Sequence, residues 1–322
     1  LSVLKTRLRG MPDTEKYRNF IAGCGAGMAE TLILYPKSKV IFRQQIYGTT
    51  TKTVLKQMRD EGFWMLYRGV LMPLLQRTTT RSIMFGIFNR LNEALGCAQC
   101  RTPQRRIICS SSAAFLAGTS EAVLCPLERT QVLMQAREFN RHYKNTLDAL
   151  SSLAKACFKL IYFYDLRNSI STLLTFLGVA ELYRGLSLIL LRNGLSNTVF
   201  FNLREPLRDV ILSDYNRSIH LRIPVRVVIF VSNFASGAIL GAFISTLFFP
   251  VNVVKQRMQI TVGTPFRSPV HVFRIIWKER NGSVRQFFRG GALNFTRSLF
   301  TWGITNATYE VLRYLLSKNL AK

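Results

Sequence analysis

Three stretches of this 322-residue chain share one pattern. Residues 35–45 read YPKSKVIFRQQ, residues 125–135 read CPLERTQVLMQ, and residues 249–259 read FPVNVVKQRMQ. In each stretch, a proline near the end of an apolar run is followed nine residues later by a glutamine. A spacing that recurs three times in one chain indicates an internal repeat, and such a repeat decides the fold before any other feature does.

An aromatic-Arg-Gly triplet follows each of these stretches. The three triplets are Tyr67-Arg68-Gly69, Tyr183-Arg184-Gly185 and Phe288-Arg289-Gly290. Chance can repeat one short signal, but it rarely repeats two signals in the same order three times. The second copy is the longest, and its surplus falls within residues 155–177. Two interpretations of this surplus stay open: an amphipathic insertion that lies on a membrane, or a gene-model error that interrupts the motif.

Six hydrophobic stretches accompany the repeats. They run near residues 19–46, 70–95, 107–136, 186–212, 225–258 and 291–316. Each is long enough to span a bilayer, which takes about 20 residues. Charged residues such as Glu30, Arg77, Glu121, Arg192 and Arg297 interrupt them. A charge at mid-bilayer costs about 2.5–3.5 kcal/mol on insertion scales, so such residues normally face a bundle interior. The pattern predicts helices around an aqueous path.

Small residues precede each of the repeated prolines. They stand four positions apart, at Gly23 and Gly27, Ala114 and Gly118, and Gly237 and Gly241. In a membrane, small residues on one helical face let two backbones approach closely. We therefore expect close helix packing at these positions.

The composition fits a membrane protein that handles anions. The chain has 44 Lys and Arg against 17 Asp and Glu, a formal charge of +27, yet 48% of its residues are hydrophobic. A soluble protein so basic usually binds nucleic acid. No zinc-finger, RNP or homeodomain pattern is present, so nucleic acid is not an expected partner. A basic and apolar chain instead suits contact with anionic lipid heads and an anionic solute.

The six cysteines and three histidines form no catalytic or metal-binding pattern. Cys97 and Cys100 have the spacing of metal ligands, but a zinc site would need further partners nearby. We therefore expect a loop with two free thiols, no metal, no cofactor and no enzymatic centre.

These features resemble the mitochondrial carrier family. Its repeat has a proline, an acid two residues later, a base five later and a glutamine nine later, followed by acid-Gly and aromatic-basic-Gly. Residues 61–69 match the second half in full, and the resemblance covers about residues 17–316. It implies an all-α membrane protein with six transmembrane helices in three pseudo-symmetric repeats and short matrix-side helices.

The resemblance also implies one carrier domain over residues 1–322, in a multi-pass protein of the mitochondrial inner membrane. The repeats are expected at about 17–97, 105–214 and 224–317, with the insertion near 155–177 in the second. Both termini would lie on the intermembrane side. Cardiolipin and other anionic lipids would be its partners, and the protein would be monomeric.

A gate on the matrix side is implied by the acid and base positions of the motif. The acid positions read Ser38, Glu128 and Asn252, and the base positions read Ile41, Gln131 and Lys255. Glu128 and Lys255 are expected to form an ion pair. Ser38 and Gln131 could share a hydrogen bond, whereas the third pair of positions cannot interact in either way. The repeated glutamines Gln45, Gln135 and Gln259 would act as braces, which predicts a weak gate.

A second gate is implied at the cytoplasmic side. The resemblance assigns it the residues Glu205, Arg313, Glu310, Arg208, Asn89 and Asn92. Glu205 and Arg313 would form its best ion pair, and hydrogen bonds would link the others.

The resemblance also implies solute-binding positions nine and ten residues after each triplet aromatic. They are Gln76, Arg77, Arg192, Asn193, Arg297 and Ser298. Three arginines that face one cavity favour a solute with two or more phosphates or carboxylates, because guanidinium groups bind such anions in bidentate fashion.

Several segments are similar to a subgroup of the family that carries NAD⁺. They are residues 42–48, 192–197, 249–255 and 302–310. The similarity implies an antiporter that imports NAD⁺ into the matrix by alternating access. Two alternatives stay open: a carrier for another organic anion, such as a dicarboxylate, a 2-oxo acid or a nucleotide, and a membrane scaffold that transports nothing.

Overall fold

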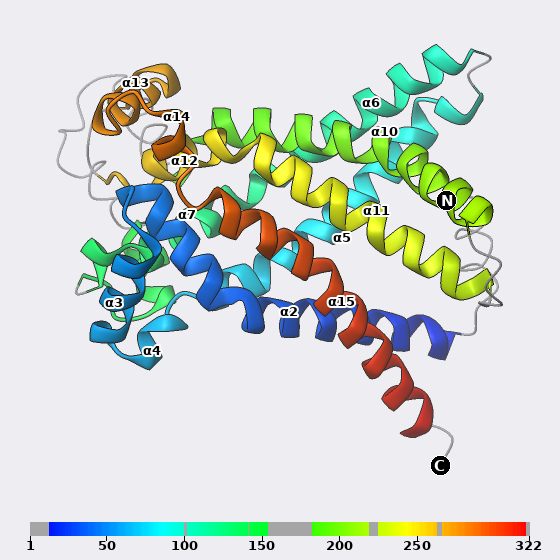
Figure 1. Cartoon of the computed structure of the whole chain (residues 1–322), viewed down its shortest axis with the longest axis horizontal. Coiled ribbons are helices and arrows are strands. Elements are labelled where there is room, and N and C mark those ends of the chain that lie inside the picture. The colour runs from blue at the N-terminus through cyan, green and yellow to red at the C-terminus, as the bar shows by residue number, and fades with distance from the viewer. Residues whose placement is uncertain are drawn as a thin grey trace, which may run out of the picture.

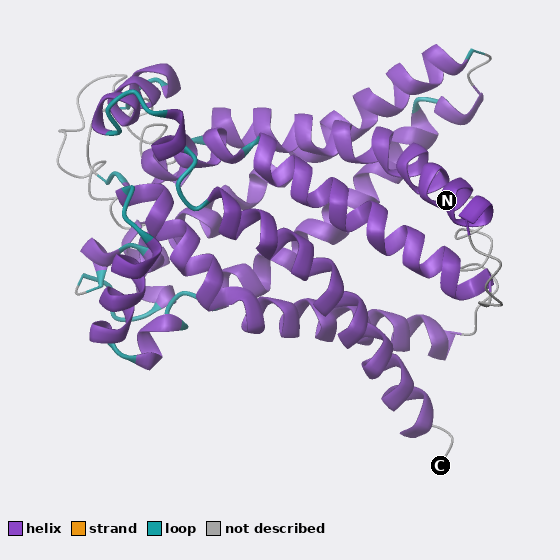
Figure 2. Cartoon of the chain, in the orientation of Figure 1, coloured by secondary structure: helices purple, strands orange, loops and turns teal. Residues whose placement is uncertain are grey.

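The chain is a bundle of helices in a computed structural model that describes residues 13–99, 102–140, 142–153, 182–218, 225–262 and 266–319. Within these ranges the secondary structure is helical, with loops between the helices and no strand (Figure 2). The surplus segment of the second repeat, residues 155–177, lies outside the described residues.

Six long elements form the bundle, and each coincides with one of the predicted hydrophobic stretches. Four are single helices: α2 (Asp13–Tyr47), α5 (Leu71–Ala94), α10 (Leu186–Ser218) and α15 (Gly291–Asn319). Two are broken, namely α6 (Pro103–Ser120) with η2 (Glu121–Leu124) and α7 (Cys125–Gln135), and α11 (Val225–Leu247) with α12 (Phe249–Ile260). The chain's last long helix, α15, packs against its first, α2, so the ring of helices closes.

The short elements gather mostly at one end of the bundle (Figure 1). That end holds α3 (Thr51–Glu61), α4 (Phe63–Leu66), α13 (Pro269–Glu279) and α14 (Val284–Phe287), and we call it the α3–α13 end. The 3-10 turn η3 (Arg137–Phe139) follows α7, and a further turn, η1 (Cys97–Gln99), follows α5. The far ends of α6 and α15 diverge from the bundle in Figure 1.

The helices α3 and α13 begin in the same way in two different repeats. Thr50 and Ser268 occupy the N-cap positions, and their hydroxyl oxygens accept hydrogen bonds from the backbone N–H groups of Thr53 and His271, both at 3.3 Å. Hydroxyl side chains at this position satisfy N–H groups that the first turn leaves without a helical partner. The matching caps support a common origin for the two segments.

Two of the repeated prolines stand where a long element breaks into two helices. Pro126 and Pro250 stand in the first turns of α7 and α12, where the missing N–H costs no helical hydrogen bond, whereas Pro36 stays inside α2. The two parts of the α11–α12 pair meet at 58°. Beyond these prolines, α7 and α12 contact each other and α2, which brings the repeated segments together.

The triplet glycines are required by the backbone conformation. Gly69, Gly185 and Gly290 have φ angles of 86°, 87° and 92°, in the region that favours glycine. A Cβ atom on Gly69 would also lie 2.8 Å from the Cβ of Met134 on α7. The aromatic-Arg-Gly triplet therefore marks a tight turn that packs against the following repeat.

The prediction of close packing at small residues is correct at one site and wrong at another. A Cβ on Gly118 would lie 2.5 Å from the carbonyl oxygen of Asn193, so α6 and α10 do approach closely there. Among the residues that the structure describes, nothing lies within 4 Å of a Cβ on Gly23 or Gly27. Gly25 makes the close contact on α2 instead, with the side chain of Leu312.

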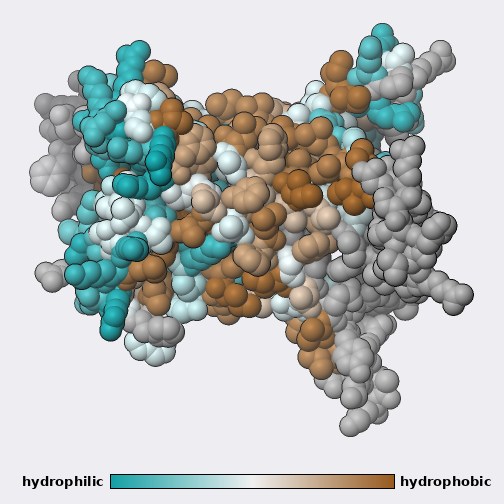
Figure 3. Space-filling view, viewed as in Figure 1, coloured by the Kyte–Doolittle hydropathy of each residue, from teal (hydrophilic) through white to brown (hydrophobic). Residues whose placement is uncertain are grey.

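The surface of the bundle is apolar and much of its interior is polar. A band of hydrophobic residues crosses the middle of the face drawn in Figure 3, and hydrophilic residues cover the α3–α13 end. Large apolar side chains such as Ile33 and Phe300 are exposed, while Arg43 and Lys255 are buried. Many exposed large apolar side chains together with buried charged groups are uncommon in a soluble protein.

By length and apolar composition alone, one described helical segment, Gln104–Gln135, could cross a membrane. A second is added if the bent pair Phe234–Leu247 and Phe249–Ile260 forms one span. The long helices that fall short of this test include α2, α5, α10 and α15. Each of these carries charged residues.

The expectation of two free thiols at Cys97 and Cys100 is wrong for Cys97. Cys97 in η1 forms a disulfide with Cys109 on α6, and the two Cα atoms are 5.5 Å apart. The chain turns back between α5 and α6, so η1 lies beside the first turns of α6. The spacing of twelve residues does not reveal this contact, because it arises from the turn.

Replacing Cys97 by Ser is expected to destabilise the protein by about 3 kcal/mol, because the disulfide closes a short loop and restricts the unfolded chain. Thermal unfolding in detergent measures this loss. Reductant should lower the unfolding temperature of the wild type to that of the variant. Replacing Cys24, a free cysteine, by Ser serves as the control. An unfolding temperature that neither reductant nor Cys97→Ser changes would contradict the prediction.

Candidate solute-binding site

A cavity of about 240 Å³ lies between the long elements. Side chains from α2, α5, α7, α10, α12 and α15 line it. The sequence-predicted residues among them are Gln76, Arg77, Arg192, Arg297, Ser38, Gln45, Glu128, Gln131, Gln135 and Lys255. Positions that are far apart in the sequence therefore meet at one polar space.

An ion pair joins α7 to α12 beside this cavity. The Lys255 ammonium donates to the Glu128 carboxylate, and both side chains are largely buried. Glu128 stands in the first turn of α7, where the helix dipole favours a negative charge. Breaking such a pair leaves a buried charge without its counter-ion, so the pair ties the second repeat to the third.

The other predicted gate positions form weaker contacts. The Ser38 hydroxyl donates to the carbonyl oxygen of Leu34 in its own helix, at 2.9 Å, although Ser38 and Gln131 both line the cavity. Ile41 packs in an apolar cluster that includes Phe249. Hence the described contacts give the first and third repeats no ion pair at this level.

The three repeated glutamines are buried. Gln45 and Gln135 line the cavity, whereas the side chain of Gln259 lies against Gly185. In two of the three repeats the glutamine therefore borders the cavity, and in the third it packs outside the cavity lining.

Arg77, on α5, forms an ion pair with Glu30 on α2. Glu30 is completely buried, and its other carboxylate oxygen accepts a hydrogen bond of 2.9 Å from the hydroxyl of Thr305 on α15. One buried acid therefore joins three helices beside the cavity.

Arg192 and Arg297 bind amide side chains instead. The Arg192 guanidinium donates to the Oδ1 atom of Asn193 at 2.9 Å, and the Arg297 guanidinium donates to the Oδ1 atom of Asn294 at 3.1 Å. Arg77, Arg192 and Arg297 all line the cavity. The arginines of three different repeats thus converge on one cavity.

Two predicted binding residues face away from the cavity lining. The Asn193 amide donates to the carboxylate of Glu121 at 3.1 Å. The Ser298 hydroxyl donates to the hydroxyl oxygen of Ser245 at 2.9 Å. Both partners lie on the preceding long element of the same repeat, so Asn193 and Ser298 link helices within a repeat.

Glu30 and Glu121 were not assigned to the site from the sequence. Glu121 accepts hydrogen bonds from Asn193 and from Asn197, the latter at 3.2 Å. The available signal was an acid inside an apolar stretch, which must face a partner or a water-filled space. That signal shows that such an acid faces inward but does not identify its partner.

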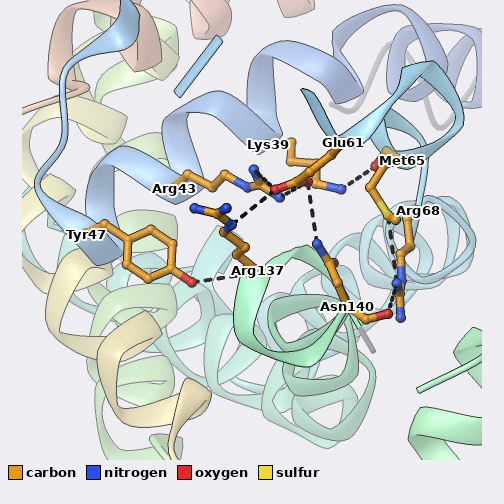
Figure 4. Close-up of polar contacts among 8 residues, drawn as sticks. All are labelled: Lys39, Arg43, Tyr47, Glu61, Met65, Arg68, Arg137 and Asn140. Atoms are coloured by element: carbon orange, nitrogen blue, oxygen red, sulfur yellow. Dashed lines mark hydrogen bonds and ion pairs between the residues drawn. The ribbon is translucent and has the colours of Figure 1, made fainter. Parts of the chain in front are cut away.

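A buried polar cluster lies at the α3–α13 end, with Glu61 at its centre (Figure 4). The two carboxylate oxygens of Glu61 bind the Arg43 guanidinium at 2.9 and 2.6 Å. Asn140 donates to the same carboxylate at 3.4 Å, and Arg137 lies 3.6 Å from it. Burial alone would raise the pKa of Glu61, but the hydrogen bond and charge of Arg43 outweigh it, and the pKa lies below its usual value.

The triplet arginines bind backbone carbonyl groups of the next repeat. Arg68 donates to the carbonyl oxygens of Phe139 and its neighbours after α7, and Arg184 donates to that of Thr261 after α12 at 2.8 Å. Arg289 donates to the carbonyl oxygen of Gly48 after α2. These bonds run from the first repeat to the second, to the third and back to the first.

Most of the predicted cytoplasmic gate lies outside the described part of the chain. The side chains concerned are those of Asn89, Glu205, Glu310 and Arg313. Arg208 binds the neighbouring Asp209, with the closest contact at 2.8 Å, and Asn92 lies near the end of α5.

A closed ring of helices with an apolar exterior surrounds an arginine-rich cavity, and a buried ion pair joins two of its elements. This architecture is typical of a membrane transport protein. The model of the family described as "Mitochondrial carrier protein" matches residues 12–98, 102–215 and 227–320. The chain belongs to this family. It is accordingly a multi-pass protein of the mitochondrial inner membrane, and a transporter rather than an enzyme.

Relatives within the family are named for the solutes they carry. The mitochondrial nicotinamide adenine dinucleotide transporter SLC25A51 of Homo sapiens is 41% identical over 295 residues, which covers 92% of this chain and 88% of the relative. Its Mus musculus counterpart is 39% identical over 309 residues, covering 96% and 92%. A probable mitochondrial 2-oxodicarboxylate carrier of Dictyostelium discoideum is 25% identical over 252 residues, covering 77% and 74%.

Replacing Glu128 by Gln is expected to destabilise the protein by about 3 kcal/mol, because Lys255 then stays buried without its counter-ion. Unfolding temperatures in detergent report the loss. Exchanging the two charges, as Glu128→Lys with Lys255→Glu, should restore most of it. Arg257→Gln is the matched control, because the pair of Arg257 with Glu279 is more exposed and contributes less than about 1 kcal/mol. Equal effects of Glu128→Gln and Arg257→Gln would refute the prediction.

The Glu61 cluster predicts a dependence of stability on pH. A carboxyl group whose pKa is lower in the folded state stabilises the fold above its unfolded pKa and loses that effect as pH falls through the folded pKa. For Glu61, whose ordinary pKa is 4.5, the loss should occur below about that pH. Wild type and Glu61→Gln should differ in unfolding temperature near pH 7 and converge near pH 3. A constant difference across this range would contradict the assignment.

Proposed function

We propose that this protein carries NAD⁺ across the mitochondrial inner membrane and imports it into the matrix by alternating access. The observation that supports this most directly is the convergence of Arg77, Arg192 and Arg297 on one cavity. Two relatives of about 40% identity are named as NAD transporters, and they match this chain over most of its length.

The arginines suit a solute with two phosphate groups. A guanidinium group presents paired N–H donors that fit phosphate oxygens, and it keeps its charge at any physiological pH. NAD⁺ is an anion because its two phosphates outweigh the positive nicotinamide ring.

Six transmembrane spans in three repeats are part of this proposal. The spans correspond to α2, α5, α6 with α7, α10, α11 with α12, and α15. Each contains more than the roughly 20 residues that a bilayer requires. The three separate matches of the family model support a threefold repeat over about 17–97, 105–214 and 224–317.

In this scheme the α3–α13 end faces the matrix and both termini face the intermembrane space. The pair of Glu128 and Lys255 closes the matrix gate, supported by Ser38, Gln131 and the glutamines Gln45, Gln135 and Gln259. The residues Glu205, Arg313, Glu310, Arg208, Asn89 and Asn92 close the opposite gate in the other state. A gate with one ion pair opens at a lower energetic cost than a gate with three.

Anionic lipids, cardiolipin among them, are the proposed partners of a monomeric carrier. Exposed basic residues such as Lys52, Lys56 and Arg59 lie on α3, and Trp64 is exposed on the following α4. Basic and aromatic side chains in this arrangement suit the boundary between lipid head groups and water.

Uptake into liposomes tests the function. Purified protein is expected to accumulate labelled NAD⁺ well above protein-free liposomes, and more rapidly than nicotinamide mononucleotide, ATP or 2-oxoglutarate. Arg297→Ala should reduce NAD⁺ uptake by about 30-fold or more, because truncating a charged contact in a buried site costs at least about 2 kcal/mol. Arg257→Gln, outside the cavity lining, should leave uptake unchanged.

Other outcomes of the same experiment would favour the alternatives. Transport of 2-oxoglutarate without NAD⁺ would replace the proposal with an organic-anion carrier, which the 2-oxodicarboxylate relative and the Arg192–Asn193 pair favour. Folded protein that moves none of these solutes, with or without Arg297→Ala, would favour a scaffold.

A further inference from the structure

Glu30 is a buried acid that has no assigned role in the gates or in solute binding. It lies on α2, six residues before Pro36, and its side chain is completely buried. One carboxylate oxygen binds the Arg77 guanidinium of α5, and the other accepts a hydrogen bond from Thr305 of α15 at 2.9 Å. Glu30 thus connects both helices of the first repeat to the last helix of the third.

The three cavity arginines differ in their described contacts. Arg77 forms an ion pair with a carboxylate, whereas Arg192 and Arg297 donate to the neutral amides of Asn193 and Asn294. A carboxylate that is bound to an arginine competes with any anion that binds there, and a neutral amide competes far less. In the described part of the chain, the Glu30 carboxylate therefore occupies the position on Arg77 that an anionic group of the solute would take.

Arg77 remains accessible to a solute. Its side chain is 27% exposed and lines the cavity, while Glu30 is 0% exposed. A guanidinium group has five N–H donors, so one contact with Glu30 leaves others that can face the cavity. An incoming phosphate or carboxylate can bind these donors first and then displace the carboxylate of Glu30.

We propose that Glu30 is an internal counter-ion of Arg77, and that an anionic group of the transported solute displaces it. Binding then removes the ion pair that links α2 to α5. Because a buried carboxylate without its cation is strongly disfavoured, its displacement favours a rearrangement of these helices. Glu30 is in this sense a positioning residue that couples solute binding to helix movement. The inference rests on the proposed transport function.

The coupling acts where the matrix gate is weakest. Ile41 and Asn252 cannot form an ion pair between the first and third repeats. At the contact between α2 and α15, which joins the same two repeats, Glu30 binds Thr305, and the Lys37 ammonium donates to the hydroxyl of Thr296 at 2.9 Å. Polar contacts therefore help to join α2 to α15, and displacement of Glu30 changes one of these contacts.

Glu30→Gln tests the inference, because glutamine keeps the size of the side chain and can still bind Thr305 but lacks the charge. Two half-saturating concentrations are measured: that of NAD⁺ in liposome uptake, and that of inorganic pyrophosphate in stabilising the detergent-solubilised protein against heat. Both are expected to fall about fivefold, because the anion no longer competes with a carboxylate. Thr305→Val is the matched control, which removes the other contact of Glu30, and it should change both values by less than about twofold.

A double-mutant cycle shows whether the effect passes through Arg77. In an Arg77→Gln background, Glu30→Gln should no longer lower either concentration, because the site of competition is gone. Unchanged or increased values for Glu30→Gln alone would overturn the inference, as would a fivefold decrease that persists in that background. If Glu30→Gln does not fold, Glu30→Asp, whose shorter side chain weakens the pair, should lower both values about twofold.

The pyrophosphate measurement separates this inference from the proposed function. If the wild type does not carry NAD⁺ but pyrophosphate binds about fivefold more tightly to Glu30→Gln, the identity of the solute is wrong and the counter-ion role stands. If NAD⁺ is carried and neither value responds to Glu30→Gln, the function stands and the counter-ion role fails.

Discussion

Charges inside this bundle must bind a counter-ion or another polar group, or face the cavity, because the outer surface at the middle of the bundle is apolar. This constraint positions the helices more strictly than apolar packing does. The ion pair of Glu128 and Lys255 fixes α7 against α12, and that of Glu30 and Arg77 fixes α2 against α5. A hydrophobic contact tolerates a shift along the helix, but a buried ion pair does not, because separation leaves both charges without a counter-ion.

The backbone imposes the same requirement at the α3–α13 end. Helix ends leave carbonyl groups without partners, and the triplet arginines satisfy carbonyls after the long helices of the following repeats. The adjacent glycines adopt positive φ angles and let these turns lie against the next repeat. The aromatic-Arg-Gly triplet thus joins neighbouring repeats, which explains why this signal recurs together with the proline spacing.

The six long elements could be predicted from the hydrophobic stretches, and the pairing of Glu128 with Lys255 and the convergence of three arginines from the resemblance to the carrier repeat, because each occupies a position of its motif. The partner of Glu30 and the orientations of Asn193 and Ser298 could not be predicted. They depend on how each helix is rotated about its axis, which the packing of several helices determines together. The disulfide of Cys97 was missed for a related reason, since a turn of the chain creates the contact.

The contact between α2 and α15 also constrains how the protein is made. These are the first and last long helices, separated by more than 240 residues, and they pack directly against each other. Until α15 is in place, the carboxylate of Glu30 on α2 lacks its hydrogen bond from Thr305. Contacts this distant in sequence form slowly. A bundle without its final helix therefore lacks the contact that closes the ring.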